Sequence, residues 1–430
     1  MRNKPLARTD AGTGYYFHAS GRTNQSEDMI VALAFSGGGT RAAAFAYGVL
    51  EELRDTKMPG MTNRSMLSEV DVISAVSGGS VTAAAYGLYG ERVFDILEPA
   101  FLTRNVQRRL VLQSLNPLRW PWLWAPTYGR SELAADNLDR TLFHGATFET
   151  LRTNGSPFIV INGTDITTGA RFDFTQHSFD LIESDVTKYP LASAVAASSA
   201  VPGALTPVTL ENFAIHGSGE LPDWIIGALD GDNGRLRRRA VQLSTFADAG
   251  TIPYVHVVDG GVCDNIGVQP YIDYVQSIPF SKARREDVAG LRARKAVLIV
   301  VNAFASPEKD WQAHEKPPGS ITTAVAAASH TLDQRSQDTV DHLKEGLFEL
   351  RKKLTLPSDV KLYVIHLSFT NYRDLKQRRF FLNLPTSFFL PGTDVTRLRE
   401  AGKELLRDDP TFQELLKDLG TGTPPALVLP

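Results

Sequence analysis

Two stretches near the N-terminus follow the same plan, and this plan constrains the fold more than any other feature of the chain. An apolar run ends in a serine and glycines, and an alanine-rich stretch follows: MIVALAFSGGGTRAAAFAYGVLEELRD at residues 29–55 and VDVISAVSGGSVTAAAYGLYG at residues 70–90. Such apolar runs are typical of strands covered on both faces, and alanine favours helices. Two successive strand–turn–helix units predict a parallel sheet flanked by helices, with Thr40 as the polar cap of the first helix.

The rest of the chain continues this α/β pattern. Short apolar segments bounded by breakers predict further strands at residues 157–163, 254–261, 295–304 and 361–369. Helices are expected at residues 190–200 and 322–354. Residues 164–176 alternate around a Thr-Gly turn, which predicts a hairpin appended to the sheet.

The chain shows no internal repeat or long linker, so one large domain with an extension is favoured over two independent domains. We expect a polar N-terminal tether at residues 1–28 and an α/β domain with a central, mostly parallel sheet at residues 29–310. A helical C-terminal extension with an added strand is expected at residues 311–430, packed on the same domain.

Composition excludes several classes of protein. The chain has 45 Lys and Arg against 48 Asp and Glu, interspersed along its length, so it lacks the basic footprint of a nucleic-acid binder. Its single cysteine, Cys263, excludes an intramolecular disulfide and a multi-cysteine zinc site. No apolar run is long enough to span a bilayer, so we expect a soluble or peripherally bound protein. An upstream leader or lipid anchor, the compartment and the oligomeric state stay open.

The first glycine turn is a candidate anion-binding loop. A P-loop would close in Gly-Lys-Ser or Gly-Lys-Thr, which is missing here, and a dinucleotide fingerprint would place a glycine where Ala42 stands. The remaining functional interpretation is that the backbone N–H groups of Gly37, Gly38 and Gly39, at a helix N-terminus, stabilise a negative oxygen that forms during a reaction. The structural alternative is a tight turn that needs positive φ.

The second turn resembles a nucleophile elbow. Ser77 stands between a strand and a helix, with Ala75, Gly78 and Gly79 as small neighbours in place of the usual Gly-x-Ser-x-Gly. The structural alternative for Ser77 is a helix N-cap.

A hydroxyl nucleophile needs a base, and the sequence offers Asp259. This residue ends the strand YVHVVD and precedes two glycines, so a carboxylate is held at a strand terminus on a flexible loop. His256, inside the same strand, is expected to be an ordinary strand histidine. The alternative for Asp259 is a turn aspartate, which Asp-Gly generally favours.

Taken together, these motifs resemble the patatin-like phospholipase family of Ser-Asp acyl hydrolases, in its bacterial members. The resemblance covers roughly residues 29–270 and is carried by four segments in family order: FSGGGTRAAAFAYGVLEEL, SAVSGGSVTAAAY, AVAASSAVPGALTPVTL and VDGGVCDNIGV. Ala42 and Ala75 depart from the family pattern without removing a reactive group.

The resemblance implies a three-layer α/β/α fold and a lipid acyl hydrolase of phospholipase A, lysophospholipase or lipase type. It implies Ser77 as nucleophile, Asp259 as base, and Gly37 to Gly39 as oxyanion hole, with an acyl-enzyme intermediate and neither metal nor cofactor. Arg41 would support the loop or contact a phosphate head group, and Asp264 and Asn265 would shape the loop after the aspartate.

One segment indicates contact with lipid. Residues 108–130, RRLVLQSLNPLRWPWLWAPTYGR, place Trp120, Trp122 and Trp124 among leucines, prolines and arginines, a mixture typical of membrane interfaces. An interfacial lid with peripheral membrane contact and simple packing over the core are both open.

Two other functions are compatible with parts of the pattern. An esterase acting on soluble short-chain esters would use the same residues. A non-catalytic, phosphate-binding α/β protein would use the glycine loop and Ser77 as a cap, but it would leave the Asp-Gly-Gly segment without a task.

Overall fold

The computed structural model describes residues 3–6, 14–17, 26–59, 64–116, 128–214, 221–282, 284, 293–306 and 360–420. Its strands are β1 Met29–Phe35, β2 Val70–Val76, β3 Phe158–Asp165, β4 Arg171–Asp173, β5 Val208–Glu211, β6 Tyr254–Asp259, β7 Lys295–Asn302 and β8 Lys361–Ser368. Its helices are α1 Thr40–Asp55, α2 Gly78–Tyr89, α3 Val93–Leu97, α4 Val106–Ser114, α6 Arg130–Leu138, α7 Phe148–Thr153, α8 Gln176–Asp180, α9 Leu191–Ser198, α10 Asp223–Leu229, α11 Gly234–Ser244, α12 Gln269–Ser277, α15 Leu375–Leu382, α16 Gly392–Arg407 and α17 Pro410–Gly420.

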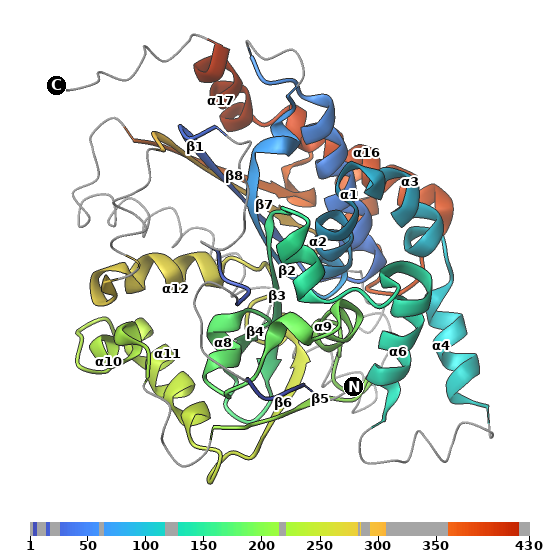
Figure 1. Ribbon diagram of the computed structural model, residues 1–430. Helices are drawn as coiled ribbons and strands as arrows, with labels where there is room; N and C mark the ends of the chain where they lie inside the picture. The colour runs from blue at the N-terminus through green and yellow to red at the C-terminus, as the bar shows by residue number, and fades with distance from the viewer. Residues whose placement is uncertain are drawn as a thin grey trace, which may run out of the picture.

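The strands form one sheet with the order β5-β6-β3-β2-β1-β7-β8, and β4 pairs with β3 (Figure 1). The centre of the sheet, from β3 to β8, is parallel, as the sequence predicts. The hairpin expected at residues 164–176 is confirmed by the antiparallel pairing of β3 and β4. Two features were not predicted: β5 is an additional strand, and β6 runs antiparallel to β3.

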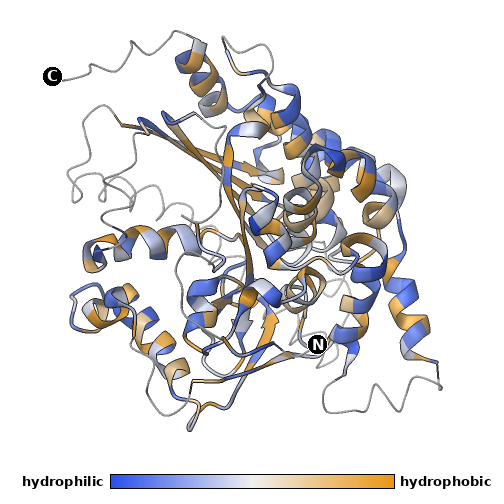
Figure 2. Cartoon of the chain, in the orientation of Figure 1, coloured by the Kyte–Doolittle hydropathy of each residue, from blue (hydrophilic) through white to orange (hydrophobic). Residues whose placement is uncertain are grey.

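Helices cover the sheet on both faces, so the architecture is the expected three-layer α/β/α. Alternate residues of β1 point to opposite sides: Val31, Leu33 and Phe35 belong to the larger apolar core, whereas Ala32 and Ala34 belong to a smaller one. In Figure 1, α1, α2 and α16 lie on one side of the sheet and α12 on the other. Figure 2 shows that apolar residues gather along the central strands and polar residues on the outer sides of the helices.

The described parts of the N-terminal segment pack on the domain, and the tether at residues 1–28 stays a prediction. Tyr15 is only 2% exposed, and its hydroxyl accepts a hydrogen bond of 2.8 Å from the Ile159 N–H of β3. Pro5 pairs with Ser184 through an isolated bridge. Burying an aromatic ring in this way stabilises the attachment of a segment that is otherwise polar.

The C-terminal part contributes to the same sheet and core. The strand expected at residues 361–369 is β8, which pairs with β7, and α16 packs along α1. The helix expected at residues 322–354 lies outside the described residues. The limits of the domains, at residues 29–310 and 311–430, stay a prediction. Within the described segments, no helix combines the length and the apolar character needed to span a bilayer.

The contact between α1 and α16 is unusually close because glycine occurs on both helices. A Cβ atom on Gly48 of α1 would lie 2.0 Å from the carbonyl oxygen of Arg399, and one on Gly402 of α16 would lie 2.5 Å from that of Phe45. Beside this contact, Arg399 forms an ion pair with Glu51 at 2.8 Å. The C-terminal helix is therefore fitted to α1 at the level of the backbone.

The close helix contact predicts that Gly402→Ala destabilises the protein, because the added methyl group forces the two backbones apart. We expect a loss of about 1–3 kcal/mol in the free energy of unfolding, measured by urea denaturation. The matched control is Gly392→Ala at the start of the same helix, where a Cβ atom would meet nothing within 4 Å. Equal effects of the two changes would contradict the close contact.

Candidate active site

The register of the sheet brings Ser77 and Asp259 together. Val76, the last residue of β2, pairs with Asn162 of β3, and the next residue of β3, Gly163, pairs with Asp259 of β6. β6 runs antiparallel to β3, so the last residue of β6, Asp259, lies near the end of β2 that leads into Ser77. The Ser77 side chain lies close enough to the Asp259 carboxylate to favour its charged form and so to lower its pKa.

Ser77 has a backbone conformation that is rare for any residue other than glycine. Its φ is 50° and its ψ is −123°, which costs about 1–3 kcal/mol. The turn is held by two hydrogen bonds: the Ser77 N–H donates to the Ser198 hydroxyl at 2.8 Å, and this hydroxyl donates to the Asn162 carbonyl at 2.6 Å. Ser77 occupies the N-cap position of α2, as its structural alternative expects, but its side chain makes no cap hydrogen bond to the helix.

The two glycines after Ser77 are explained by contact with the first glycine turn. A Cβ atom on Gly78 would lie 2.0 Å from the carbonyl oxygen of Gly39, and one on Gly79 would lie 2.6 Å from that of Ser36. The start of α2 therefore packs directly against the backbone of the loop that follows β1. Only glycine permits this approach.

One of the three backbone amides of the glycine loop is already engaged in a hydrogen bond. The Gly37 N–H donates to the Asn265 carbonyl at 2.9 Å, so the expectation that it also belongs to an oxyanion hole is not supported. In the part of the chain that the structure describes, the N–H groups of Gly38 and Gly39 have no hydrogen-bond partner. Both residues have positive φ, at 139° and 60°, and they lie directly before α1.

The start of α1 differs from the expected polar cap. Gly39 takes the N-cap position, and Thr40 is the first residue of the helix. Among the described residues, the buried Thr40 hydroxyl has no hydrogen-bond partner. Its backbone N–H donates to the carbonyl of Ser387 at 2.8 Å, so a distant segment replaces the side-chain cap.

Asp259 lies beside Ser77 and also makes the hydrogen bond of a turn aspartate, which was its alternative interpretation. One carboxylate oxygen accepts the N–H of Gly261 at 2.7 Å, and the backbone carbonyl accepts the Thr164 hydroxyl at 2.9 Å. The residue is 6% exposed. Burial raises the pKa of Asp259 from 3.8 to about 6, whereas the hydrogen bonds from Gly261 and Ser77 lower it. This carboxylate is therefore a stronger base than an exposed one.

The segment after Asp259 positions the glycine loop. The carboxylate of Asp264 accepts the backbone N–H groups of Ile266, Gly267 and Gln269 at 3.3, 3.1 and 2.8 Å. The turn fixed in this way places the carbonyl of Asn265 against Gly37. The geometry fits the expectation that Asp264 and Asn265 shape this region.

Arg41 supports the loop from the other side. Its guanidinium, 3% exposed, donates to the carbonyls of Ala303 and Leu384 at 2.9 and 2.7 Å and to the Thr386 hydroxyl at 3.1 Å. A group buried among these acceptors is not placed to meet a phosphate head group, so the loop-support interpretation is favoured.

The sequence did not point to the segment 384–387 as part of the site. A Cβ atom on Gly39 would lie 2.3 Å from the carbonyl oxygen of Ser387, so this segment touches the loop directly. The Ser387 hydroxyl donates to the side chain of Gln107 on α4 at 2.7 Å. The prolines around residues 384–391 are the only local signal of an ordered, extended segment.

The remaining candidate residues do not contribute to this site in the described structure. Trp120, Trp122 and Trp124 lie outside the described residues. His256 contacts the Thr209 hydroxyl of the neighbouring strand at 3.0 Å, as expected of a strand histidine. Within the described ranges, no three His, Cys, Asp or Glu residues are grouped so that they could hold a metal ion.

The contact of Arg41 with Thr386 predicts that Thr386→Val destabilises the protein. Valine keeps the shape of threonine but leaves a buried guanidinium N–H without its acceptor, which costs about 1–3 kcal/mol in the free energy of unfolding. Thr386→Ser keeps the hydroxyl and is the matched control. A urea unfolding curve of the valine variant that coincides with that of the serine variant would refute the contact.

The pKa of Asp259 predicts a pH-dependent difference in stability between the wild type and Asp259→Asn. Since the folded protein holds this proton up to about pH 6 and the unfolded chain only up to about pH 4, the wild type loses stability as the pH rises through this window. At pH 8 we expect the variant to be more stable by about 2–3 kcal/mol, with the difference shrinking toward pH 4.

Urea denaturation at several pH values tests this expectation. The control is Asp232→Asn, which changes an exposed carboxylate after α10. A difference between Asp259→Asn and the wild type that does not change with pH would show that burial does not shift this carboxylate.

The comparisons with known proteins agree with the sequence motifs. The profile of the family described as patatin-like phospholipase matches residues 33–272. Similar solved structures include human GIVD cytosolic phospholipase A2 (12% identity, TM-score 0.45, covering 92% of this chain and 60% of that one). VipD from Legionella pneumophila is another, with 12% identity and a TM-score of 0.28, covering 93% of this chain and 70% of that one.

The chain thus spans about 60% of the length of the human enzyme. No curated protein sequence matches it. Since the family profile covers more than half of the residues, including both glycine turns and the end of β6, the chain belongs to the patatin-like phospholipase family.

Proposed function

We propose that the protein is a lipid acyl hydrolase that cleaves carboxylic esters through Ser77 and Asp259. The observation that carries the proposal is that the sheet register places the strained Ser77 beside the buried Asp259, inside the part of the chain that matches the family profile. Neither the strain nor the buried carboxylate benefits folding, and such features concentrate at reactive sites.

The proposed reaction has two halves. Asp259 accepts the hydroxyl proton of Ser77 while the serine oxygen attacks the ester carbonyl, and the negative charge that forms on the carbonyl oxygen is stabilised by the N–H groups of Gly38 and Gly39. The C–O bond then breaks, and the leaving alcohol takes the proton from Asp259. In the second half, water attacks the acyl-serine, Asp259 takes its proton, and the acid leaves as Ser77 regains a hydrogen.

The raised pKa suits Asp259 to this role. A carboxylate with an ordinary pKa of 3.8 binds a proton weakly, whereas one with a pKa of about 6 is still ionised at neutral pH and accepts a proton more readily. The base would be available above about pH 6 and lost below it. We therefore expect kcat/KM to decrease as the pH is lowered through the pKa of Asp259.

Family membership favours lipid esters, of phospholipase A, lysophospholipase or lipase type, and such substrates imply contact with a lipid surface. An esterase for soluble short-chain esters would have the same dyad and differ only in substrate profile. The phosphate-binding alternative has less support, because the Gly37 N–H is already used and the loop lies against Ser77.

Labelling with a fluorophosphonate probe, read by intact mass, tests the dyad. We expect one adduct on the wild type and none on Ser77→Ala. Asp259→Asn should be labelled at least about 100-fold more slowly, which is the usual contribution of a general base. Ser244→Ala, on α11, is the control and should be labelled like the wild type.

Two outcomes would contradict the proposal. An adduct that persists on Ser77→Ala would place the nucleophile elsewhere. A folded wild type that forms no adduct would favour the non-catalytic alternative.

A further inference from the structure

Helix α4 presents apolar and basic side chains to solvent on one face. Arg108, Val111, Leu112 and Leu115 follow the i, i+3, i+4, i+7 spacing that puts residues on one side of a helix, and the exposed Arg104 directly precedes the N-cap residue Asn105. We call these five residues the α4 stripe. Val111, Leu112 and Leu115 are 51%, 57% and 66% exposed.

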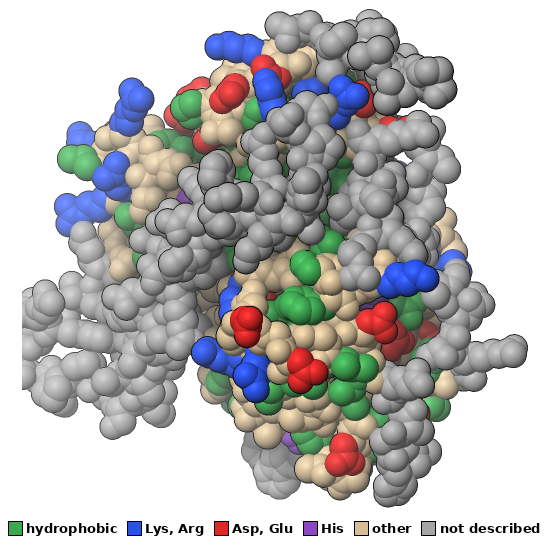
Figure 3. All heavy atoms as spheres, turned by 90° about the vertical axis from the view of Figure 1, so that its left-hand side faces the viewer, with side chains coloured by type: hydrophobic (Ala, Val, Ile, Leu, Met, Phe, Trp, Pro, Cys, Tyr) green, Lys and Arg blue, Asp and Glu red, His purple; other side chains and the backbone are tan. Residues whose placement is uncertain are grey.

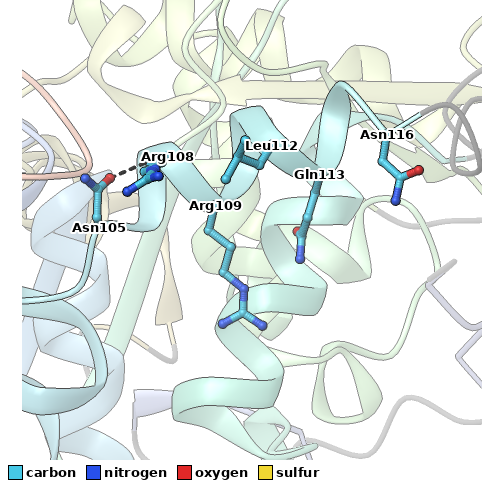
Figure 4. A pocket seen from close by; sticks show the side chains of 6 residues that line it. All are labelled: Asn105, Arg108, Arg109, Leu112, Gln113 and Asn116. Carbon is cyan, nitrogen blue, oxygen red and sulfur yellow. Dashed lines mark hydrogen bonds between the residues drawn. The ribbon is translucent and has the colours of Figure 1, made fainter.

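The opposite side of α4 fixes the outward direction of the stripe. Val106 and Leu110 pack against the large apolar core, and the side chain of Asn137 on α6 donates to Gln113 at 2.7 Å. The Asn105 side chain caps the helix by accepting the N–H of Arg108 at 2.8 Å. A shallow hollow of about 350 Å³ runs along the exposed side, and Figure 4 shows Arg108, Arg109 and Leu112 among the residues that line it.

The chain segment that contains α4 carries charged side chains of a single sign, whereas Glu98 and Glu132 lie directly outside it. From residue 99 to residue 131 the chain contains five arginines and no aspartate or glutamate, although Asp and Glu outnumber Lys and Arg in the whole sequence by 48 to 45. A surface of this kind attracts anionic partners and repels cationic ones.

Among the described residues, the other large exposed apolar side chains stand singly on their helices, strands or loops. On the side of the molecule that Figure 3 shows, acidic and apolar side chains are interspersed over the lower half. Ile226, 52% exposed, is on α10, which begins with Asp223, and Leu375, 71% exposed, is on α15. What distinguishes α4 is therefore that three exposed apolar residues and a basic residue share one side of a short helix.

Helix α4 is also connected to the candidate active site. Gln107, on α4, accepts the hydroxyl of Ser387, and the carbonyl of Ser387 accepts the N–H of Thr40, the residue after Gly39. A lipid surface bound to α4 would thus lie close to the glycine loop.

We propose that the α4 stripe is the surface through which the protein binds an anionic lipid membrane. This inference rests on the proposed lipid acyl hydrolysis and adds the docking face and the charge class of the lipid. Val111, Leu112 and Leu115 enter the head-group region, as the apolar face of an interfacial helix does, and Arg104 and Arg108 attract anionic head groups. The electrostatic part weakens as salt screens the charges.

Vesicle sedimentation tests the proposal with two double variants. Vesicles of phosphatidylcholine alone are compared with vesicles that also contain phosphatidylglycerol, at low and high salt. Arg104→Gln/Arg108→Gln should weaken binding to the anionic vesicles roughly 25-fold, because each basic residue near such a surface contributes about a five-fold factor. Val111→Ser/Leu112→Ser should weaken binding to the same vesicles and leave its salt dependence in place.

The matched control is Arg373→Gln/Leu375→Ser, which changes an exposed arginine and an exposed leucine at the start of α15. It should bind vesicles like the wild type. All variants should have the urea unfolding midpoint of the wild type, since the changed side chains are exposed.

Labelling by the fluorophosphonate probe in solution separates the two proposals. Both α4 variants should be labelled like the wild type, because the stripe does not contact Ser77 or Asp259. Vesicle binding that is unchanged in the α4 variants would overturn the docking face even if the dyad is reactive. Equal binding of the wild type to both kinds of vesicle would overturn the anionic preference.

Sedimentation velocity tests the competing occupant of the stripe. A dimer that dissociates in Val111→Ser/Leu112→Ser would show that a second copy of the chain covers this face, and would overturn the membrane assignment.

Discussion

The candidate site depends on one backbone contact, between the glycine loop after β1 and the turn at Ser77. Gly78 approaches the carbonyl of Gly39 so closely that no side chain fits between them. This contact joins the ends of two neighbouring strands into one unit, and the other supports act on that unit. Asn265 holds it from the segment after Asp259, and Ser387 holds it from the C-terminal part of the chain.

Two features of this unit work against folding and must be offset by the rest of the molecule. Ser77 has a strained backbone, and Asp259 is a carboxylate withdrawn from water. β2, which leads to Ser77, contacts both apolar cores, β6 buries Val255 and Val257 in the larger one, and the C-terminal helix α16 adds a close contact with α1. A large, continuous core makes such local costs tolerable, which is how functional sites usually depart from the most stable arrangement.

Strand and helix positions could be predicted well because short apolar runs and breakers are local signals. The direction of β6 could not, since a strand reads the same in either direction and its partner is set by the fold. The segments around Ser77, Asp259 and the glycines were identified from local turns. The hydrogen bond from the Gly37 N–H to the Asn265 carbonyl could not be predicted, because the two residues are more than 200 positions apart in the sequence. The role of residues 384–387 was missed for the same reason: hydrogen bonds to backbone carbonyls leave almost no trace in a sequence.

The residues that contact the glycine loop and its flanking elements also indicate how much of the chain is needed to hold the candidate site. The family profile ends at residue 272, yet β7, which pairs along the whole of β1, and Ser387, which caps α1, both lie beyond it. A fragment cut at the profile boundary would keep Ser77 and Asp259 and expose an unpaired edge of β1. The family profile is thus shorter than the set of elements that hold the candidate site, and an excised or transplanted version of this site must extend through the C-terminal helices.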